Sequence, residues 1–249
     1  MVSFKQSNPE RGPRTVQLRI RRSEPGHASV RWETFDVPLD DRVTVLDALF
    51  FVLRERDRTL AFRCACRAAM CGSCAMVVNG SERLACKTAL ADVANGRPVR
   101  VEPLRNLPVV KDLVVDVDPL FDKYTAIEPW LRIDPRVQEP AVIPPSDEWR
   151  LQIGEGLDCI SCGACYSACP MVAADPDYLG PMQLLRAFNV LADERGQSTP
   201  EPRLDEVFGR HGVWRCHDIS ECTRVCPKGL NPALAIRRLK RGALLDAFG

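Results

Sequence analysis

Cysteine is the residue type with the clearest chemical role in this chain, which has 12 cysteines among 249 residues. A first group has the spacing C-x4-C-x2-C-x11-C and comprises Cys66, Cys71, Cys74 and Cys86. This spacing is typical of plant-type [2Fe–2S] sites, in which three thiolates of a tight loop and a fourth from a neighbouring strand hold the cluster. Gly72 and Ser73 are small enough to let backbone amides approach the sulfides. Zinc also binds cysteine pairs and is the alternative here.

Two further groups lie in the C-terminal half, and both end in Cys-Pro. One reads C-x2-C-x2-C-x3-C-P and comprises Cys159, Cys162, Cys165 and Cys169. In bacterial ferredoxins the last cysteine of such a run binds the other cluster of a pair. The other group reads C-x5-C-x3-C-P and comprises Cys216, Cys222 and Cys226. If each run gives its last cysteine to the other run's cluster, a [4Fe–4S] cluster is predicted on Cys159, Cys162, Cys165 and Cys226.

The cysteines that remain provide one ligand fewer than a cubane needs, and they are Cys169, Cys216 and Cys222. A cubane corner without a thiolate readily loses its iron, so this set predicts a [3Fe–4S] cluster. Ile219 stands where a full motif has its further cysteine. We expect it to raise the potential of this centre, and a plain core aliphatic is its alternative role. Only Cys64 is left over, and we predict that it is not a ligand.

Composition and charge narrow the class of protein. Hydrophobic residues make up 45% of the chain. The net charge is only +1, so the chain has no overall positive potential that would attract nucleic acid. No apolar run reaches the roughly 18–20 residues of a membrane-spanning helix, and the polar N-terminus lacks the apolar segment of a secretory signal. We therefore expect a cytosolic chain whose cysteines hold metal rather than disulfides. A zinc-ribbon module, which would be colourless, is the alternative class.

The elements that must position the cysteines change in character along the chain. Up to residue 106 the pattern is mixed: strands at 15–22, 30–37 and 99–101, a helix capped by Thr44, and a hairpin at Asn79-Gly80. After it, helices are predicted at 147–154, 181–193, 204–209 and 232–247, with Pro181 and Pro232 in first turns. A proline-rich connector is expected near 128–145. The sequence thus predicts an α+β chain with domains at 1–106 and 107–249.

Three clusters of different type, in this order, resemble the iron–sulfur subunits of succinate dehydrogenases and quinol:fumarate reductases. The resemblance covers residues 15–247. It rests on CRAAMCGSC at 66–74, LAC at 84–86, CISCGAC at 159–165 and CPKGLNP at 226–232, and Gly180-Pro181-Met182 is similar to the family's linker into its long helix. It implies an N-terminal β-grasp ferredoxin-like domain followed by an all-α helical ferredoxin domain.

The resemblance also implies partners and a direction of electron flow. A flavoprotein with covalent FAD would oxidise succinate to fumarate, and a membrane anchor would hold quinone. Electrons would pass from FAD through [2Fe–2S], [4Fe–4S] and [3Fe–4S] to quinone, at the cytoplasmic side of a prokaryotic plasma membrane. The same architecture serves menaquinol:fumarate reductases, and the spacing does not separate the two directions. A soluble multi-cluster ferredoxin is a further alternative.

In the family, this subunit contributes residues to the quinone pocket. By motif position they are Pro170, His217, Ile219 and Lys240. For His217 the alternative role is a structural hydrogen bond to the cluster loop. Members that use ubiquinone have a tryptophan shortly after the Cys-Pro, whereas residues 171–174 here read MVAA, which favours menaquinone. The basic run at 237–241 is either a solvated helix face or a contact for anionic lipid headgroups.

Overall fold

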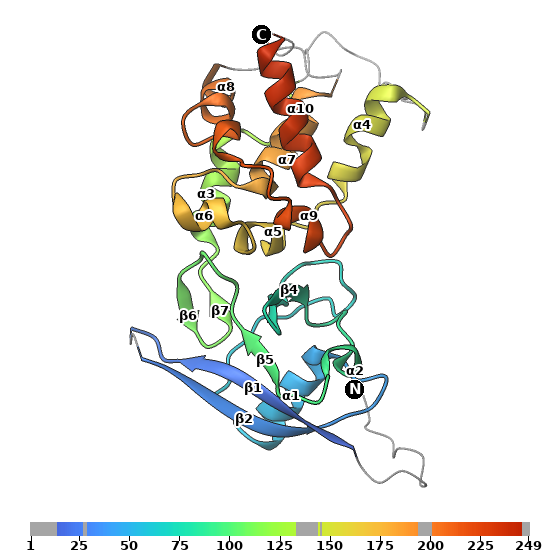
Figure 1. Ribbon diagram of the computed structural model, residues 1–249, viewed down its shortest axis with the longest axis vertical. Helices are drawn as coiled ribbons and strands as arrows, with labels where there is room; N and C mark the ends of the chain where they lie inside the picture. The colour runs from blue at the N-terminus through green and yellow to red at the C-terminus, as the bar shows by residue number, and fades with distance from the viewer. Residues whose placement is uncertain (1–13, 27–28, 133–143, 145, 194–200, 246–249) are drawn as a thin grey trace. The chain divides into compact units, whose positions relative to one another are not determined.

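The chain is described by a computed structural model over residues 14–26, 29–132, 144, 146–193 and 201–245 (Figure 1). Its contacts divide it into two compact units, Met1–Asp116 and Val117–Gly249. The first unit carries the sheet and the second is helical, so the predicted α+β class is confirmed. The division follows Asp116, later than the boundary expected after residue 106, because the intervening segment packs with the first unit.

A five-stranded sheet forms the first unit, in the order β2-β1-β5-β3-β4 (Figure 1). The strands are β1 (Thr15–Ser23), β2 (Val30–Pro38), β3 (Ala75–Val78), β4 (Ser81–Leu84) and β5 (Val99–Glu102). Strand β1 pairs antiparallel with β2 and parallel with β5. A parallel pair needs a crossover connection, and that connection contains helices α1 (Val45–Glu55) and α2 (Leu90–Val93). This is the β-grasp arrangement that the resemblance implied.

The local sequence signals of this unit are confirmed. Leu18 and Ile20 of β1 are fully buried, as the alternation predicted. Thr44 caps α1, since its hydroxyl accepts a hydrogen bond from the Asp47 amide at 3.2 Å while the Asp47 carboxylate accepts one from the Thr44 amide at 3.0 Å. Strands β3 and β4 are joined by Asn79-Gly80, and both residues have positive φ, at 49° and 84°, as a two-residue hairpin loop requires.

A buried arginine joins distant segments of the first unit. Arg22 of β1 is fully buried, and its Nε donates to the Asp112 carboxylate at 3.0 Å while its Nη1 donates to Glu33 at 2.6 Å and to Asp57. The Asp112 carboxylate also accepts the backbone amide of Ala61 at 2.9 Å. The Arg22 guanidinium and the Thr59 hydroxyl hold the pKa of Asp57 well below its usual range.

The Arg22 network explains the position of the domain boundary. Asp112 lies in the turn between β6 (Val109–Lys111) and β7 (Val114–Val115), and its amide donates to the Ser23 hydroxyl at 2.9 Å. The hairpin is therefore fixed to β1 by a fully buried carboxylate. The sequence did not predict this boundary, because residues 107–116 carry no strong periodic pattern. A buried ion pair whose two partners are far apart in sequence also leaves no local pattern.

The second unit is built from helices of unequal length. The longer ones are α3 (Asp118–Ala126), α4 (Glu148–Leu157), α7 (Pro181–Leu191), α8 (Glu201–Phe208) and α10 (Pro232–Leu244). Short turns of helix carry the cysteines, namely α5 (Ala164–Ser167), α6 (Pro170–Ala174), the 3-10 helix η1 (Val213–Arg215) and α9 (Glu221–Arg224). Helix α7 is central and mostly buried (Figure 1). Pro181 and Pro232 occupy first turns, as predicted.

Two features of this unit were not predicted. Helix α3 was missed because Leu120 is its only fully buried residue, so it has little amphipathic pattern. The start of the expected connector is fixed by arginines: Arg186 donates to the Pro129 carbonyl at 2.7 Å and 2.9 Å, and Arg203 donates to the Trp130 carbonyl at 2.8 Å. Connector residues 133–143 and 145 lie outside the described residues. Among the helices described, none has the length and apolar character to cross a bilayer.

Removal of Asp112 should loosen the first unit specifically. Asp112→Ala leaves the Arg22 guanidinium buried without its one fully buried carboxylate partner, and breaking a buried ion pair typically costs about 3–5 kcal/mol. We expect amide hydrogen exchange in β1 and β2 to accelerate by about 100-fold or more, measured by mass spectrometry. The matched control is Asp41→Ala, since Asp41 also pairs with an arginine at 3.0 Å but its side chain is 82% exposed; the expected effect is below about 1 kcal/mol. Equal effects of the two variants would contradict a structural role for the Arg22 network.

Candidate metal centres

All twelve cysteines lie within the described residues, and none forms a disulfide. The first predicted ligand set surrounds the end of the β3–β4 hairpin. Cys74 precedes β3 and Cys86 follows β4, and the Ala85 amide donates to the Cys74 carbonyl at 3.0 Å. These two thiols therefore reach the same end of the hairpin, as the pattern of a loop plus a neighbouring strand predicted.

The loop that carries Cys66 and Cys71 directs backbone amides at sulfur. The amides of Ala68, Met70 and Cys71 donate to Cys66 Sγ at 3.4, 3.3 and 3.3 Å. Arg67 and Ala69 both have φ of 55°, and such alternation of backbone conformation turns successive N–H groups toward one concavity. Amide donors around a thiolate stabilise its negative charge, as at iron–sulfur sites.

The thiols of this set have opposing electrostatic environments. Hydrogen bonds from the Ser73 hydroxyl and from Cys66 lower the pKa of Cys71 to about 6. Burial raises the pKa of Cys74 to about 12, and the neighbouring Cys86 and Cys71 thiols add to this. A thiol in the position of Cys74 becomes a thiolate only when a cation compensates its charge. The set therefore fits a metal cluster better than four free thiols.

Cys64 occupies a different environment. It lines a groove of about 500 Å³, together with Phe50, Leu53, Leu60 and Phe62. The four predicted ligands are not among the residues that line this groove. This placement supports the prediction that Cys64 does not bind the cluster.

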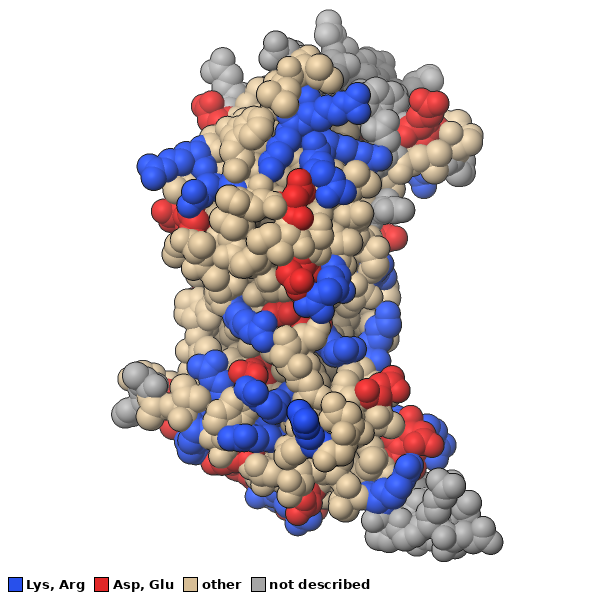
Figure 2. Space-filling model, in the orientation of Figure 1, with Lys and Arg blue, Asp and Glu red and all other residues tan. Residues whose placement is uncertain are grey.

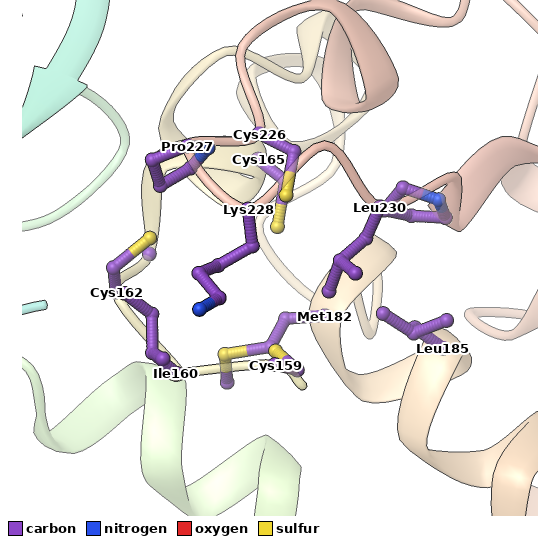
Figure 3. Close-up of a pocket in the computed structure, with 12 residues that line it drawn as sticks. Cys159, Ile160, Cys162, Cys165, Met182, Leu185, Cys226, Pro227, Lys228 and Leu230 are labelled. Carbon is purple, nitrogen blue, oxygen red and sulfur yellow. The ribbon is translucent and has the colours of Figure 1, made fainter. Parts of the chain in front are cut away.

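A second ligand set gathers around one pocket of the helical unit (Figure 3). Four cysteines line this pocket, namely Cys159, Cys162, Cys165 and Cys226. Met182, Leu185 and Leu230 add apolar side chains to the lining, and the Lys228 side chain extends into the space between the sulfur atoms (Figure 3). Cys226 thus lies with the first three cysteines of the ferredoxin run, which supports the predicted exchange of ligands.

Burial makes these thiols difficult to ionise alone. Burial raises the pKa of Cys162 to about 11, and it raises the pKa of Cys165 well above the ordinary value. In both cases the neighbouring thiols of the set act in the same direction. Four half-buried sulfur ligands around one pocket suit a group that carries several iron ions, because coordination deprotonates a thiol outright.

The third set consists of Cys169 at the start of α6, Cys216 after η1 and Cys222 in α9. Burial raises the pKa of Cys169 and that of Cys222, to about 11 for Cys222, and the proximity of Cys216 adds to both shifts. Tyr178 lies against this set: burial raises the pKa of its phenol, and the thiols of Cys216, Cys169 and Cys222 act in the same direction. The three thiols lie near enough to act on one another and on Tyr178, which supports the predicted set of three.

A carboxylate connects the two chain segments that carry the third set. Asp175, which follows α6, accepts a hydrogen bond from Arg215 Nε at 2.5 Å and lies 3.0 Å from His211 Nδ1. Arg215 directly precedes Cys216. Burial raises the pKa of Asp175, but the hydrogen bonds from His211 and Arg215 outweigh it and lower the pKa. Sequence reasoning missed Asp175 and Tyr178, since neither belongs to a spaced motif.

The residues predicted for a quinone pocket lie near this third set. Pro170 and His217, like Ile219, are exposed, and Ile219 is 53% exposed, so the alternative of a core aliphatic is wrong. Lys240 Nζ donates to the Cys216 carbonyl at 2.7 Å. Among the described residues the His217 imidazole makes no hydrogen bond, so the alternative structural role for His217 finds no support.

Family comparisons agree with this arrangement. A family model described as a 2Fe-2S iron-sulfur cluster binding domain matches residues 17–122, and one described as a 4Fe-4S dicluster domain matches residues 155–230. The chain is thus an iron–sulfur protein with two cluster-binding domains. The fumarate reductase iron-sulfur subunit of Mycobacterium tuberculosis is 42% identical over 224 residues, which are 87% of each chain. The succinate dehydrogenase iron-sulfur subunit of Paracoccus denitrificans is 38% identical over 241 residues, 93% of this chain and 89% of the relative.

The chain therefore belongs to the family of iron–sulfur subunits of succinate dehydrogenases and fumarate reductases. Its fold is similar to that of a chain in a structure entitled Mycobacterium smegmatis Sdh1 complex in the apo form. The TM-score is 0.79 at 24% sequence identity, and the match covers 92% of this chain and 96% of the other.

Replacement of Cys64 should leave the first cluster intact. Cys64→Ser is expected to keep the [2Fe–2S] resonance of the reduced protein, because Cys64 lies in the groove and not at the end of the β3–β4 hairpin. Electron paramagnetic resonance of the dithionite-reduced complex measures this. Cys66→Ser is the control, and it should perturb the resonance strongly. Loss of the signal in Cys64→Ser alone would mean that Cys64 replaces Cys66 as a ligand.

Replacement of Asp175 should weaken the third set alone. In Asp175→Ala the segments of Cys169 and Cys216 lose the carboxylate that connects them, so we expect fewer [3Fe–4S] clusters per [2Fe–2S] cluster. The ratio of the two paramagnetic signals, integrated in oxidised and reduced samples, measures this. Asp177→Ala, at an exposed carboxylate two residues away, should keep the wild-type ratio. A normal ratio in Asp175→Ala would show that the connection is dispensable.

Proposed function

We propose that this chain is the electron-transfer subunit of a succinate:quinone oxidoreductase and holds three clusters. The observation that supports this best is the pocket in which Cys226 joins Cys159, Cys162 and Cys165. It leaves Cys169, Cys216 and Cys222 together as a set of three. When bound, iron–sulfur clusters take up and release single electrons without large rearrangement of their ligands.

We propose the following ligands for the clusters. Cys66, Cys71, Cys74 and Cys86 hold [2Fe–2S]; Cys159, Cys162, Cys165 and Cys226 hold [4Fe–4S]; and Cys169, Cys216 and Cys222 hold [3Fe–4S]. Electrons enter from FAD in a flavoprotein partner and leave to quinone. The chain's own contribution is to fix the thiols, to direct amides at Cys66 and to bring the Lys228 ammonium near four sulfur ligands, which offsets negative charge.

The quinone would bind beside the third set, against Pro170, His217, Ile219 and Lys240. The exposure of Ile219 and His217 supports this, because an apolar side chain left open to solvent next to a redox centre suits contact with an apolar ligand or an anchor. Lys240 is held by the Cys216 carbonyl and so stays near the centre. Menaquinone is favoured over ubiquinone, since residues 171–174 lack a tryptophan.

The same end of the helical unit is suited to a membrane surface. Lys and Arg side chains gather over α10 in Figure 2, and Arg237, Arg238 and Arg241 of this helix are exposed. Juxtamembrane basic side chains are attracted to anionic lipid headgroups of the cytoplasmic leaflet. We infer a peripheral subunit, held by a membrane-anchor partner at the cytoplasmic face of a prokaryotic plasma membrane.

Fumarate reduction by menaquinol is the second candidate function. The observation that favours it is the 42% identity to a subunit named for fumarate reductase. The two functions differ in the direction of electron flow and use the same ligands in this chain.

Isolation of the complex from membranes tests the function. An affinity tag on this chain should co-purify a larger flavoprotein with covalent FAD and a membrane anchor, and the complex should reduce a menaquinone analogue with succinate. The rate of menaquinol:fumarate reduction in the same preparation decides between the two candidates. Recovery of the chain alone from the soluble fraction, with its clusters intact, would instead support a soluble ferredoxin.

Substitution of His217 should separate the two ends of the electron path. His217→Ala is expected to slow succinate:quinone reduction about 10-fold, because a lost hydrogen bond costs about 0.5–1.5 kcal/mol and about 1.4 kcal/mol corresponds to tenfold in rate. Succinate oxidation with an artificial acceptor that takes electrons from the flavin should stay near wild type. If both activities fall equally, His217 supports the fold and not the quinone reaction.

A further inference from the structure

One tyrosine hydroxyl in the helical unit lacks a protein partner. Tyr178 lies between α6 and α7 and is fully buried, and its hydroxyl has no hydrogen-bond partner among the described residues. Its backbone is satisfied, since its amide donates to the Asp175 carbonyl at 3.0 Å and its carbonyl accepts Lys123 Nζ at 2.8 Å. The backbone thus holds the residue in place while the side-chain hydroxyl is left over.

Buried hydroxyl groups in native proteins are nearly always hydrogen-bonded, so an unpaired one calls for a partner outside the protein chain, either an ordered water or a bound group. The nearby buried Tyr166 illustrates the usual case, because its hydroxyl lies 3.0 Å from Lys123 Nζ. The groups beside the Tyr178 phenol are the thiols of Cys216, Cys169 and Cys222. These three cysteines are the ligands proposed above for the [3Fe–4S] cluster.

A neutral thiol is a weak acceptor, whereas a metal-bound thiolate or a cluster sulfide carries negative charge and accepts strongly. The phenol offers one O–H donor and is neutral at ordinary pH. The orphan hydroxyl and the three-cysteine set therefore complement each other only when the cluster is present. This complementarity also supports the fit of the set to a cluster.

We propose that the Tyr178 hydroxyl donates a hydrogen bond to a sulfur of the cluster held by Cys169, Cys216 and Cys222, and thereby raises the reduction potential of that cluster. Reduction adds negative charge to the sulfur atoms, so the hydrogen bond is stronger in the reduced state and favours it. No proton or covalent bond is transferred. Tyr178 is a positioning residue that tunes the centre nearest the proposed quinone site, and this inference rests on the [3Fe–4S] assignment of the proposed function.

Tyr178→Phe removes the hydroxyl and keeps the ring. In the complete complex, a redox titration followed by electron paramagnetic resonance should give a lower midpoint potential for the [3Fe–4S] signal. A change of about tenfold in the reduction equilibrium corresponds to about 59 mV for one electron. The matched control is Tyr166→Phe, which also deletes a buried hydroxyl but one that is paired with Lys123. It should leave the midpoint of the [3Fe–4S] signal unchanged.

A second variant keeps the Tyr178 hydroxyl in place and moves the potential in the opposite direction. The chain has 3 tyrosines, so in a Tyr124→Phe, Tyr166→Phe background Tyr178 is its only tyrosine. Incorporation of 3-fluorotyrosine then makes the Tyr178 hydroxyl a stronger donor and should raise the midpoint above that of the unlabelled background. Partner subunits also take up the analogue. The control is therefore the same labelling of a complex whose chain carries Tyr178→Phe in addition to the two background substitutions. In this control the midpoint of the [3Fe–4S] signal should not rise.

The outcomes separate this inference from the proposed function. A normal [3Fe–4S] signal whose midpoint does not move in Tyr178→Phe or with the fluorinated residue overturns the role of Tyr178 alone. A wild-type complex without any [3Fe–4S] signal overturns the cluster assignment and, with it, the role of Tyr178. A lower midpoint in Tyr178→Phe and a higher one with the fluorinated residue, with Tyr166→Phe unchanged, supports the hydrogen bond.

Discussion

Thiolate sulfur atoms that share a buried site repel one another, and burial disfavours each charge further. Both effects act on Cys165, whose pKa burial and three neighbouring thiols of its set raise well above the ordinary value. The arrangement becomes favourable when cations compensate the sulfur charges, as iron does in a cluster. The short helices around the cysteines have few buried residues of their own, so we expect cluster binding to stabilise the second unit.

The chain brings these sulfur atoms together through contacts between distant segments. Cys226 lines the same pocket as Cys159 although α5, α6, α7 and α9 lie between them in sequence, and α7 contributes Met182 and Leu185 to the lining. Asp175 connects the segment of Cys169 to that of Cys216 through Arg215. In the first unit the buried Arg22 plays a comparable role by fixing the 57–61 segment that leads into the cysteine loop. Polar side chains thus set the positions of segments that have few apolar residues.

Sequence patterns predicted the features that depend on neighbouring residues. The alternation of β1, the Thr44 cap, the Asn79-Gly80 hairpin and the first-turn prolines follow from local backbone rules, and the cysteine sets follow from spacing. Asp112, Asp175 and Tyr178 could not be found in this way, because their roles depend on partners that are remote in sequence. The exposure of Ile219 contradicts only its alternative role as a core aliphatic, because residue type alone does not tell a buried isoleucine from one that a ligand or partner covers.

The central claim is that three separate cysteine sets hold three clusters of different type. Mössbauer spectroscopy of the complex grown on iron-57 tests it most directly, because each cluster type has its own spectral component and every iron is counted. The account predicts about nine iron atoms per chain, divided among [2Fe–2S], [4Fe–4S] and [3Fe–4S] components in a ratio near 2:4:3. A spectrum without a [3Fe–4S] component in protein kept free of oxygen, or cysteine sets filled by zinc, would contradict it.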